Sequence, residues 1–561
     1  MKIFDKLKNI IAQIREDQEI NDQERSFIER NAAYWRKYHG TSLEQKKSKY
    51  VLIDYELNPF VLVSNMSLGS IIAHEHKAAK LILLPHPLKR KMREIIASYQ
   101  DCLILCKKDY WYFFKLLFCL IPALKIFSQL KTPDDILNLE MNGVKVGDKI
   151  YDTILARHSL ASINKLDMVV FWAIWQTLEY ANFMARVADL YTIDSAVFAH
   201  NMLVAGGVPF NILLGRNVEI FLRSGSRNLT LRKVRNINQA NVHTITPERK
   251  YLDYILKNHK EEVLRATEKY MLARFENEVD GLPVSLAFTK MKKTYTSRQD
   301  FAQNFQLDVN KKNIFVMLHA FNDGPHYFEF LIFKDYGQWF LETLEIAKEM
   351  KDVNWIFKEH PGANYYQTNL NLEKIFESLN EKHIVYLGMN ANFNARSIQY
   401  VADGLVTCRG TAGIEFATTG VPCVLGGDSF YSDHGFTIEP KNREEYRQAL
   451  EGLKSGKRLS AEQMEMAKIF MYTYGEMIVS ENYYFCPSAR DFHVSHELPK
   501  TFWTDAAELL EDKHAERLNH LISQMKFFIN NEKYLQYVDL DVYGYMRGAV
   551  EGAGDSVLSS R

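Results

Sequence analysis

The sequence has few cysteines, and they form no recognisable framework. The chain of 561 residues contains six, with no CxxC pair and no histidine at the spacing of a zinc site. We interpret them as reduced thiols of a cytosolic protein, and we expect no structural metal. The six are Cys102, Cys106, Cys119, Cys408, Cys423 and Cys486.

An excess of charge of either sign is also missing. Lys and Arg together number 69, and Asp and Glu together number 69, so the formal net charge is zero. Proteins whose main partner is nucleic acid usually carry a basic excess, so we expect no nucleic-acid partner. The hydrophobic share of 47% and the charged share of 25% are typical of globular proteins.

No apolar run is long enough to cross a membrane. The most apolar stretch, residues 111–127, contains Lys115, Pro122 and Lys125, whereas a span needs about 20 apolar residues. We interpret this stretch as a buried or interfacial helix. Lysines interrupt the apolar residues at the N-terminus, so we expect no signal peptide there. That segment predicts a helix packed on its own protein, with an anionic membrane surface as the alternative.

What the chain does have is a repeated alternation of strands and helices. This alternation predicts two α/β domains, of which the second is a regular, parallel, doubly wound sheet. Helical segments precede the first domain and follow the second. The predicted parts are an N-terminal helical segment (residues 1–48) and an N-terminal Rossmann-like acceptor domain with helical insertions (49–305). They are followed by a C-terminal Rossmann-like donor domain (306–475) and a C-terminal helical segment with a tail (476–561).

The segment RGTAG, residues 409–413, lies between an apolar strand and a short helix. A helix N-terminus beginning near Ala412 offers unpaired N–H groups, and glycines such as Gly410 allow an anion to approach closely. Thr411 could donate to a phosphate oxygen or cap the helix, and Arg409 adds a fork-shaped donor. The pattern fits a phosphate-binding turn and a plain strand-to-helix turn about equally well.

Other polar residues follow the strands of the same predicted sheet. Lys358 and His360 end one strand and His319 ends another, so all three are candidates for donor binding. Glu415, one turn into the short helix, could accept hydrogen bonds from a ribose or simply favour the helix N-terminus. Ser432 lies in the polar loop after the last strand and is a further candidate.

Candidates for a general base lie in the first domain. Asp148 and Asp152 occur in residues 142–157, where a carboxylate could take the proton of an acceptor hydroxyl. Aspartates beside glycines also serve plain local hydrogen bonding, so both interpretations stay open. His200, after an apolar strand, is a second candidate base.

Several segments together resemble the bacterial capsule and surface-polysaccharide biosynthesis glycosyltransferases, including the β-Kdo transferases. The resemblance is strongest over residues 313–450 and looser over residues 142–215. It implies a GT-B fold, in which two Rossmann-like domains face a cleft and the C-terminal one binds the nucleotide donor. The segments that carry it are NWIFKEHP, VTCRGTAGIEFATTGVPCVLGG, SFYSDHGFTIEP and EEYRQAL, with NGVKVGDKIYDTILAR in the first half.

The chain is also similar to the bacterial sialyltransferases, in which an HP motif and a later Ser/Thr motif hold a CMP-sugar. The matching positions are His360-Pro361 and Thr411. This chain has RGTAG where those enzymes have a paired Ser/Thr, so CMP, UDP and CDP all stay open as the nucleotide.

The resemblance implies an inverting, metal-independent glycosyltransferase with no cofactor beyond its nucleotide-sugar substrate. CMP-Kdo or a related CMP-sugar is the favoured donor, and a glycan or lipid-linked molecule is the acceptor. The expected location is cytoplasmic, with peripheral contact with the inner membrane left open. Alternatives are a CDP-polyol phosphotransferase, a sugar-nucleotide epimerase, and a non-catalytic component of a capsule-assembly complex.

Overall fold

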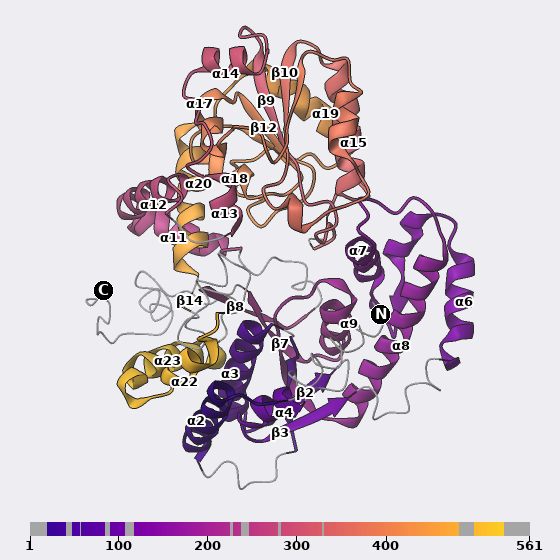
Figure 1. Ribbon diagram of the computed structural model, residues 1–561, viewed down its shortest axis with the longest axis vertical. Helices are drawn as coiled ribbons and strands as arrows, with labels where there is room; N and C mark the ends of the chain where they lie inside the picture. The colour runs from indigo at the N-terminus through magenta and orange to yellow at the C-terminus, as the bar shows by residue number, and fades with distance from the viewer. Residues whose placement is uncertain are drawn as a thin grey trace, which may run out of the picture.

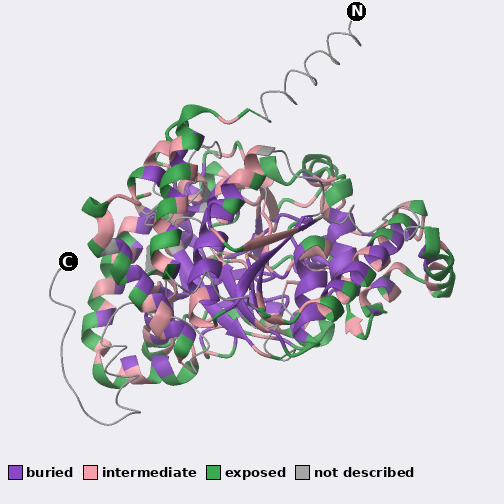
Figure 2. Ribbon diagram, turned by 90° about the horizontal axis from the view of Figure 1, so that it is seen from below, coloured by how far each residue is buried: buried purple, intermediate pink, exposed green. Residues whose placement is uncertain are grey.

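Two separate β-sheets organise the computed structural model (Figure 1). The buried strands form the centre of the molecule, and helices surround them (Figure 2). The structure describes residues 19–40, 48–56, 58–84, 90–106, 117–224, 228–236, 246–278, 282–327, 330–478, 480–481 and 499–531.

The first sheet has the strand order β14-β8-β7-β6-β1-β2-β3. The five strands from β7 to β3 are parallel, whereas β8 and β14 extend the sheet antiparallel at one edge. The strands are β1 (Tyr50–Asp54), β2 (Ala79–Leu84), β3 (Cys102–Cys106), β6 (Ile193–Phe198), β7 (Glu219–Ser224), β8 (Asn228–Val234) and β14 (Ser480–Glu481).

Side chains on alternate residues of these strands enter two different cores. Val51 and Ile53 of β1 point into one core and Leu52 into the other, as the two-residue period of a strand requires. The first core also contains α3 (Pro59–Glu75) and α4 (Arg90–Ala97). The second contains α6 (Leu120–Gln129), α7 (Gly147–His158), α8 (Met168–Leu190) and α9 (Leu203–Leu214), together with the short β4 (Glu140–Met141), β5 (Val144–Lys145) and η3 (Pro133–Asn138).

The terminal helices pack on this first sheet rather than forming bodies of their own. The ring centroids of Phe27, in α2 (Asp22–His39), and Trp503, in α22 (Phe502–Glu508), lie 5.0 Å apart. Both side chains share a core with the strands and with α23 (Ala515–Asn530). The described parts of the two segments that were predicted to flank the domains therefore complete the first domain.

The second sheet is wholly parallel and has the order β11-β10-β9-β12-β13. In chain order this is 3-2-1-4-5, the same order as the five parallel strands of the first sheet. The prediction of two doubly wound, Rossmann-like domains is thus confirmed. The strands are β9 (Lys312–Met317), β10 (Val353–Lys358), β11 (Ile384–Leu387), β12 (Gly404–Thr407) and β13 (Cys423–Leu425).

Helices cover both faces of the second sheet. One face carries α15 (Tyr336–Glu349), α16 (Leu372–Glu377) and α19 (Arg443–Gly452). The other carries α17 (Ile398–Val401), α18 (Ala412–Ala417) and α20 (Ala461–Tyr472), joined by α11 (Arg249–Asn258), α12 (Lys260–Phe275), α13 (Leu282–Ala287) and α14 (Arg298–Asn304).

The helices α11 to α14 were expected in the first domain, because the predicted boundary lay at residues 305–306. Their buried side chains, such as Leu252 and Phe275, instead share a core with the strands of the second sheet. The run of basic residues at 223–235 predicts contact with an anionic acceptor, but in its described part Arg223, Arg232 and Lys233 are buried. Lys233 is buried in β8, and its ammonium group donates to the carbonyl of Ile529 at 2.8 Å.

We expect Trp503→Ala to destabilise the first domain by about 3–5 kcal/mol, because it removes a buried aromatic side chain from the core. Trp172→Ala is a matched control, since Trp172 is 46% exposed and Trp503 is 7% exposed. The measurement is chemical denaturation followed by circular dichroism. Equal effects of the two substitutions would show that the C-terminal helices do not contribute to this core.

Candidate functional site

The carboxyl edge of the second sheet gathers most of the predicted donor-binding residues. The strand order reverses between β9 and β12, and ligands of doubly wound folds bind beyond this reversal. His319 follows β9, Lys358 ends β10 just before His360, and Arg409, Gly410 and Thr411 follow β12. The structure therefore brings these residues to one edge of the sheet, and binding of a donor there stays a prediction.

His319 connects the ends of the two central strands. Its Nε2 accepts a hydrogen bond from the Arg409 backbone N–H at 3.1 Å and lies 3.2 Å from the Thr407 hydroxyl. Burial, and after it the neighbouring His360 and Arg409 groups, lower the pKa of His319 well below the ordinary value. His319 is thus a neutral imidazole that fixes the turn after β12.

Arg409 points into the protein and holds a loop. Its guanidinium donates to the carbonyls of Pro325 at 2.7 Å and Phe330 at 2.6 Å, and the residue is 5% exposed. This arrangement fixes the loop after β9 against the turn after β12. Arg409 was predicted to bind a phosphate, and in this structure its guanidinium positions the loop instead. Direct contact between Arg409 and a phosphate stays a prediction.

In the turn at residues 409–413 a tyrosine side chain packs closely against Gly413, and the approach of an anion to the glycines stays a prediction. A Cβ on Gly413 would lie 2.2 Å from the Tyr431 hydroxyl oxygen, so only glycine fits. Tyr431 in turn donates to the carbonyl of Gly410. Thr411 is exposed and does not cap α18 with its side chain. Within the described residues, the backbone N–H groups of Thr411 and Ala412 have no protein acceptor.

Ser432 holds this turn through a chain of two hydrogen bonds. Its hydroxyl accepts from the backbone N–H of Ser429 at 2.9 Å, and the Ser429 hydroxyl donates to the carbonyl of Arg409 at 3.0 Å. Both serines are buried. The loop after β13 therefore holds the turn in place, and a contact between Ser432 and a donor stays a prediction.

Glu415 forms a buried ion pair that sequence reasoning did not foresee. Its carboxylate accepts from Arg274 Nε at 3.1 Å and from the Arg274 NH2 group, and both residues are less than a tenth exposed. Arg274 belongs to α12, so the pair anchors the helical insertion to α18. The expected contact of Glu415 with a ribose stays a prediction, beside this structural role.

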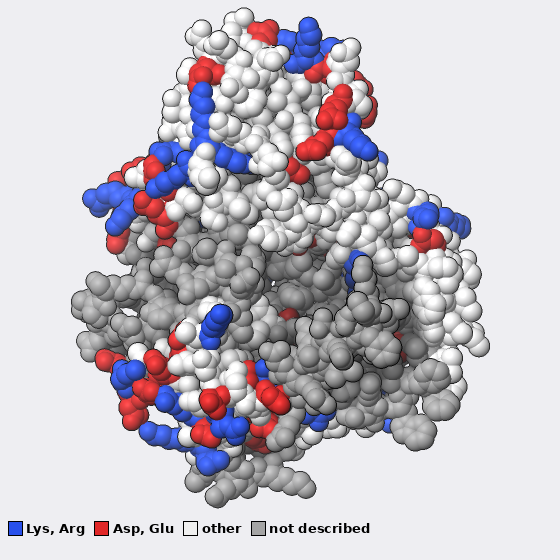
Figure 3. Space-filling model, viewed as in Figure 1, with Lys and Arg blue, Asp and Glu red and all other residues white. Residues whose placement is uncertain are grey.

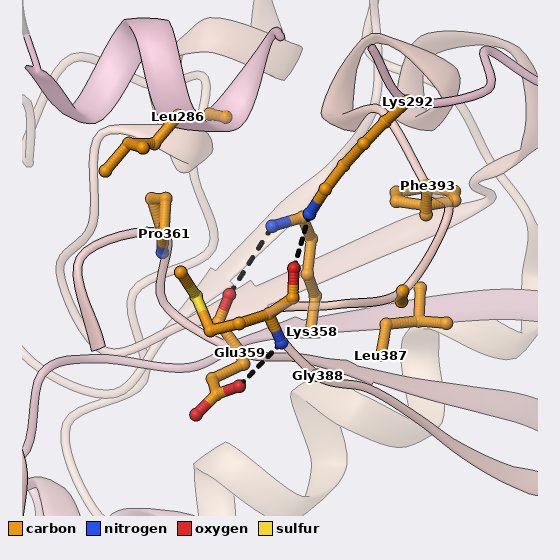
Figure 4. Close-up of a pocket in the computed structure, with 11 residues that line it drawn as sticks. Leu286, Lys292, Lys358, Glu359, Pro361, Leu387, Gly388 and Phe393 are labelled. Atoms are coloured by element: carbon orange, nitrogen blue, oxygen red, sulfur yellow. Dashed lines mark hydrogen bonds between the residues drawn. The ribbon is translucent and has the colours of Figure 1, made fainter. Parts of the chain in front are cut away.

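A pocket opens at the ends of β10 and β11, on the same carboxyl edge of the sheet as the turn (Figure 4). Its enclosed volume is about 20 Å³, room for roughly one water molecule, and a volume of about 330 Å³ is reached only with the space open to solvent included. Two lysines enter it: Lys292 donates to the carbonyl of Met389, and Lys358 lies 3.4 Å from the carbonyl oxygen of Glu359. Its apolar walls are Leu286, Ala287, Leu387, Ala391 and Phe393.

The charge in this pocket is poorly solvated. Burial and the nearby Lys292 lower the pKa of Lys358 to about 8. Burial and the nearby Lys358 lower the pKa of His360 to about 4. His360 is therefore neutral at pH 7. Its Nδ1 accepts from the backbone N–H of Gly362 at 3.1 Å, which leaves the proton on Nε2. An anion placed here would relieve the desolvated charge of Lys358.

The candidate bases Asp148 and Asp152 lie on α7, one turn apart and thus on one face. Both carboxylate oxygens of Asp152 are bonded to His326 of the second domain. Oδ1 accepts from the His326 ring Nδ1 at 2.6 Å, and Oδ2 accepts from the His326 backbone N–H at 3.1 Å. Burial alone would lower the pKa of His326, but the Asp152 carboxylate outweighs it and the pKa is raised. Asp148 differs: Oδ2 pairs with Lys149 at 2.8 Å, whereas Oδ1 is buried and has no protein partner among the described residues.

The third candidate base, His200, belongs to an acidic cluster that sequence reasoning missed. Its Nε2 lies 3.3 Å from Glu56 Oε1. Although burial lowers the pKa of His200, the hydrogen bond and charge of Glu56 outweigh it and raise the pKa. Asp54 ends β1, beside β6, and burial followed by the charge of Glu56 raises its pKa to about 8. The position of Asp54 at the end of a central strand is the signal that could have found it.

The carboxyl edges of the two sheets meet near this cluster. A Cβ on Gly324, in the loop after β9, would lie 2.5 Å from the methyl group of Met202, in the loop after β6. Gly324 has a φ of 57°, a left-handed conformation that suits glycine. The loops after the first-domain strand β6 and the second-domain strand β9 are therefore in direct contact.

No family model and no curated protein matches the chain. Similar solved structures include the KpsC β-Kdo 2,4 transferase of Thermosulfurimonas dismutans, at 11% identity, with 50% of this chain and 88% of that chain covered and a TM-score of 0.28. The UDP-GlcNAc 2-epimerase of Neisseria meningitidis is 10% identical, over 76% and 97% of the two chains, with a TM-score of 0.23. The wall teichoic acid polymerase TagF is 10% identical, over 92% and 98%, with a TM-score of 0.20.

Likenesses at these TM-scores carry no argument about fold or activity. The assignment of two doubly wound domains therefore depends on the strand orders of the sheets. The assignment of a site depends on the groups that gather at their carboxyl edges.

We expect Lys358→Met to raise the melting temperature of the ligand-free protein by a few degrees at pH 7. The pKa of Lys358 is about 8 in the folded protein, against an ordinary value of 10.5. Between these values the unfolded chain binds more protons, so the stability of the native protein rises with pH. The advantage of the variant should therefore shrink as the pH approaches 10.

The measurement is a series of thermal melts from pH 6 to pH 10, with Lys374→Met as the control. Lys374 is exposed on α16, so its substitution should leave the pH dependence unchanged. A lower melting temperature for Lys358→Met at pH 7 would contradict the view that this charge is poorly solvated.

Proposed function

We propose that the protein is a glycosyltransferase of bacterial capsule or other surface-polysaccharide biosynthesis. It transfers a sugar from a nucleotide-activated donor, with CMP-Kdo or a related CMP-sugar favoured, to a glycan or lipid-linked acceptor. The observation that carries the proposal is the pocket with Lys358 and Lys292, on the same carboxyl edge of the sheet as the turn with the open N–H groups of Thr411 and Ala412. The pocket lies at the ends of β10 and β11, and the strand-order reversal lies between the neighbouring β9 and β12.

The chemistry of this pocket matches a nucleotide. The apolar residues such as Leu286 and Phe393 offer surface for a base at the mouth of the pocket, since its enclosed part of about 20 Å³ is too small to hold one. Lys358 gains solvation from an anion, and the N–H groups of Thr411 and Ala412 add two donors for phosphate oxygens. These groups would stabilise the negative charge that develops on the departing nucleotide phosphate.

His360 acts in this proposal as a neutral hydrogen-bond donor. Its pKa of about 4 excludes an imidazolium at pH 7, and its Nδ1 already accepts from Gly362. The remaining Nε2–H can donate to the leaving phosphate without giving up its proton. Lys358 supplies the positive charge, and the proposed mechanism uses neither a metal nor a cofactor.

Asp148 is the proposed general base. It is on the same face of α7 as Asp152, which contacts the second domain, and its buried Oδ1 has no protein partner among the described residues. That oxygen can accept the proton of an acceptor hydroxyl as the hydroxyl attacks the sugar. Asp152 is already bonded to His326, and the raised pKa of His200 makes its neutral, proton-accepting form less populated than that of an ordinary histidine. Both are therefore weaker candidates.

The donor is tested by thermal shift and calorimetry with CMP, CDP, UDP and GDP. A ligand that binds only the native state raises its melting temperature by mass action. We expect CMP to raise the melting temperatures of the native protein and of Lys374→Met equally. Its affinity for Lys358→Met should be at least about tenfold lower. If no nucleotide binds, the proposal fails.

The same preparations, given donor and acceptor, distinguish the reaction classes by product mass. Addition of a sugar supports the proposal. Addition of a phosphate-linked alcohol would indicate a polyol phosphotransferase, and isomerisation of the donor without an acceptor would indicate an epimerase. Nucleotide binding without any turnover would point to a non-catalytic role in an assembly complex.

We expect Asp148→Asn to lower the transfer rate by roughly 10²–10⁴-fold, which is the usual contribution of a general base. Nucleotide affinity should stay unchanged, because the pocket lies in the other domain. Asp152→Asn is the informative comparison, since it leaves His326 without its counter-ion and should mainly lower the melting temperature. Equal transfer rates for Asp148→Asn and the native protein would show that Asp148 is not the general base.

A further inference from the structure

A row of apolar side chains faces solvent along α6 and the residues just before it. Leu117 and Leu124 are both 49% exposed, Ile121 is 77% exposed and Phe118 is 78% exposed. Their spacing of three and four residues places them along one side of the helix. The sequence suggested a buried or interfacial helix here, and in the described part the only buried residue of α6 is Ala123.

Helix α8 packs along α6, and its beginning lies beside the C-terminal end of α6. The rings of Phe127 and Phe171 are 5.8 Å apart, and Asn182 contacts the Cys119 sulfur at 3.4 Å, so the two helices run antiparallel. Two more exposed apolar residues, Met168 and Trp172, begin α8. We call Leu117, Phe118, Ile121, Leu124, Met168 and Trp172 the α6 patch. Figure 3 shows few charged side chains at the edge of the molecule where Figure 1 places α6.

Along α6 itself the charge pattern is one-sided, because between Asp109 and Asp134 the sequence contains no acidic residue. Lys125 and Lys131, at the exposed surface of this stretch, are its described cations. Acidic residues border the patch at its other end, where Asp134 and Asp135 follow Lys131 and Asp167 precedes Met168. Apolar side chains flanked by lysines, with a tryptophan nearby, are the combination that lies in the headgroup region of an anionic bilayer.

The α6 patch suits a membrane surface better than a crossing or a second protein copy. A helix of 10 residues is about 15 Å long, whereas a span needs about 30 Å. No helix in the described ranges is long and apolar enough to cross a membrane. A stable dimer typically buries about 800 Å² on each partner, and a ridge about 15 Å long and 10 Å wide offers far less.

We propose that the α6 patch docks the protein on the surface of an anionic lipid bilayer. The apolar side chains enter the boundary between headgroups and acyl chains, and Lys125 and Lys131 meet anionic headgroups. This inference is independent of the proposed function, because it concerns the face of the first domain that α6 and α8 form. Docking would place the acceptor-side domain next to any lipid-linked acceptor.

The test is flotation of the full chain with vesicles of phosphatidylcholine alone and of phosphatidylcholine with 30% phosphatidylglycerol. We expect the native protein to float with the anionic vesicles, and more weakly in high salt. The double variant Phe118→Ser, Ile121→Ser should bind at least about tenfold less, because two apolar side chains no longer enter the lipid. Both side chains are more than three-quarters exposed, so the fold should be kept.

The matched control is Leu272→Ser, Met291→Ser, which removes two exposed apolar side chains from the second domain. It should float like the native protein. Equal binding by the native protein and the patch variant, or no binding by the native protein, would overturn the proposal. So would a native dimer that the patch variant converts to a monomer in analytical ultracentrifugation, because the patch would then be a protein interface. Nucleotide binding, measured without vesicles, tests the proposed function separately.

Discussion

The ion pair between Asp152 and His326 fixes how the two halves of the site face each other. It joins α7 of the first domain to the loop after β9 of the second, and His326 also donates to the carbonyl of Lys334 at 2.8 Å. The neighbouring Asp335 accepts from the Tyr151 hydroxyl at 2.7 Å and the Ser162 hydroxyl at 2.6 Å. Several buried polar contacts thus hold one face of α7 against the second domain, and Asp148 lies on that face.

The groups at the carboxyl edge of the second sheet divide into a supporting set and a set that can still bond a ligand. His319, Arg409, Ser432 and Glu415 are bonded to other protein groups and give the turn its shape. Lys358, His360 and the N–H groups after Gly410 retain capacity for a ligand. The charge of Lys358 lowers the stability of the ligand-free protein, because burial leaves it poorly solvated. A bound anion would offset this loss.

The doubly wound fold, and the meeting of polar residues at one carboxyl edge, could be predicted from the sequence because both follow from local patterns. Strand ends are visible as apolar runs that stop at polar residues, which is how Lys358, His360 and Arg409 were found. The partner of Glu415 could not be found in this way, because Arg274 is 141 positions away and belongs to an insertion. The same holds for Asp152 and His326, since only the packing of the two domains brings them together.

The packing of α22 and α23 on the first domain has a consequence for the order of folding. The second domain is built from one continuous stretch, from α11 to the end of α20, so it can form as soon as that stretch is synthesised. The first domain receives β14, α22 and α23 only afterwards. During synthesis the apolar surface around Phe27 therefore stays exposed until Trp503 has been made. A chaperone that binds exposed apolar surfaces would bind there.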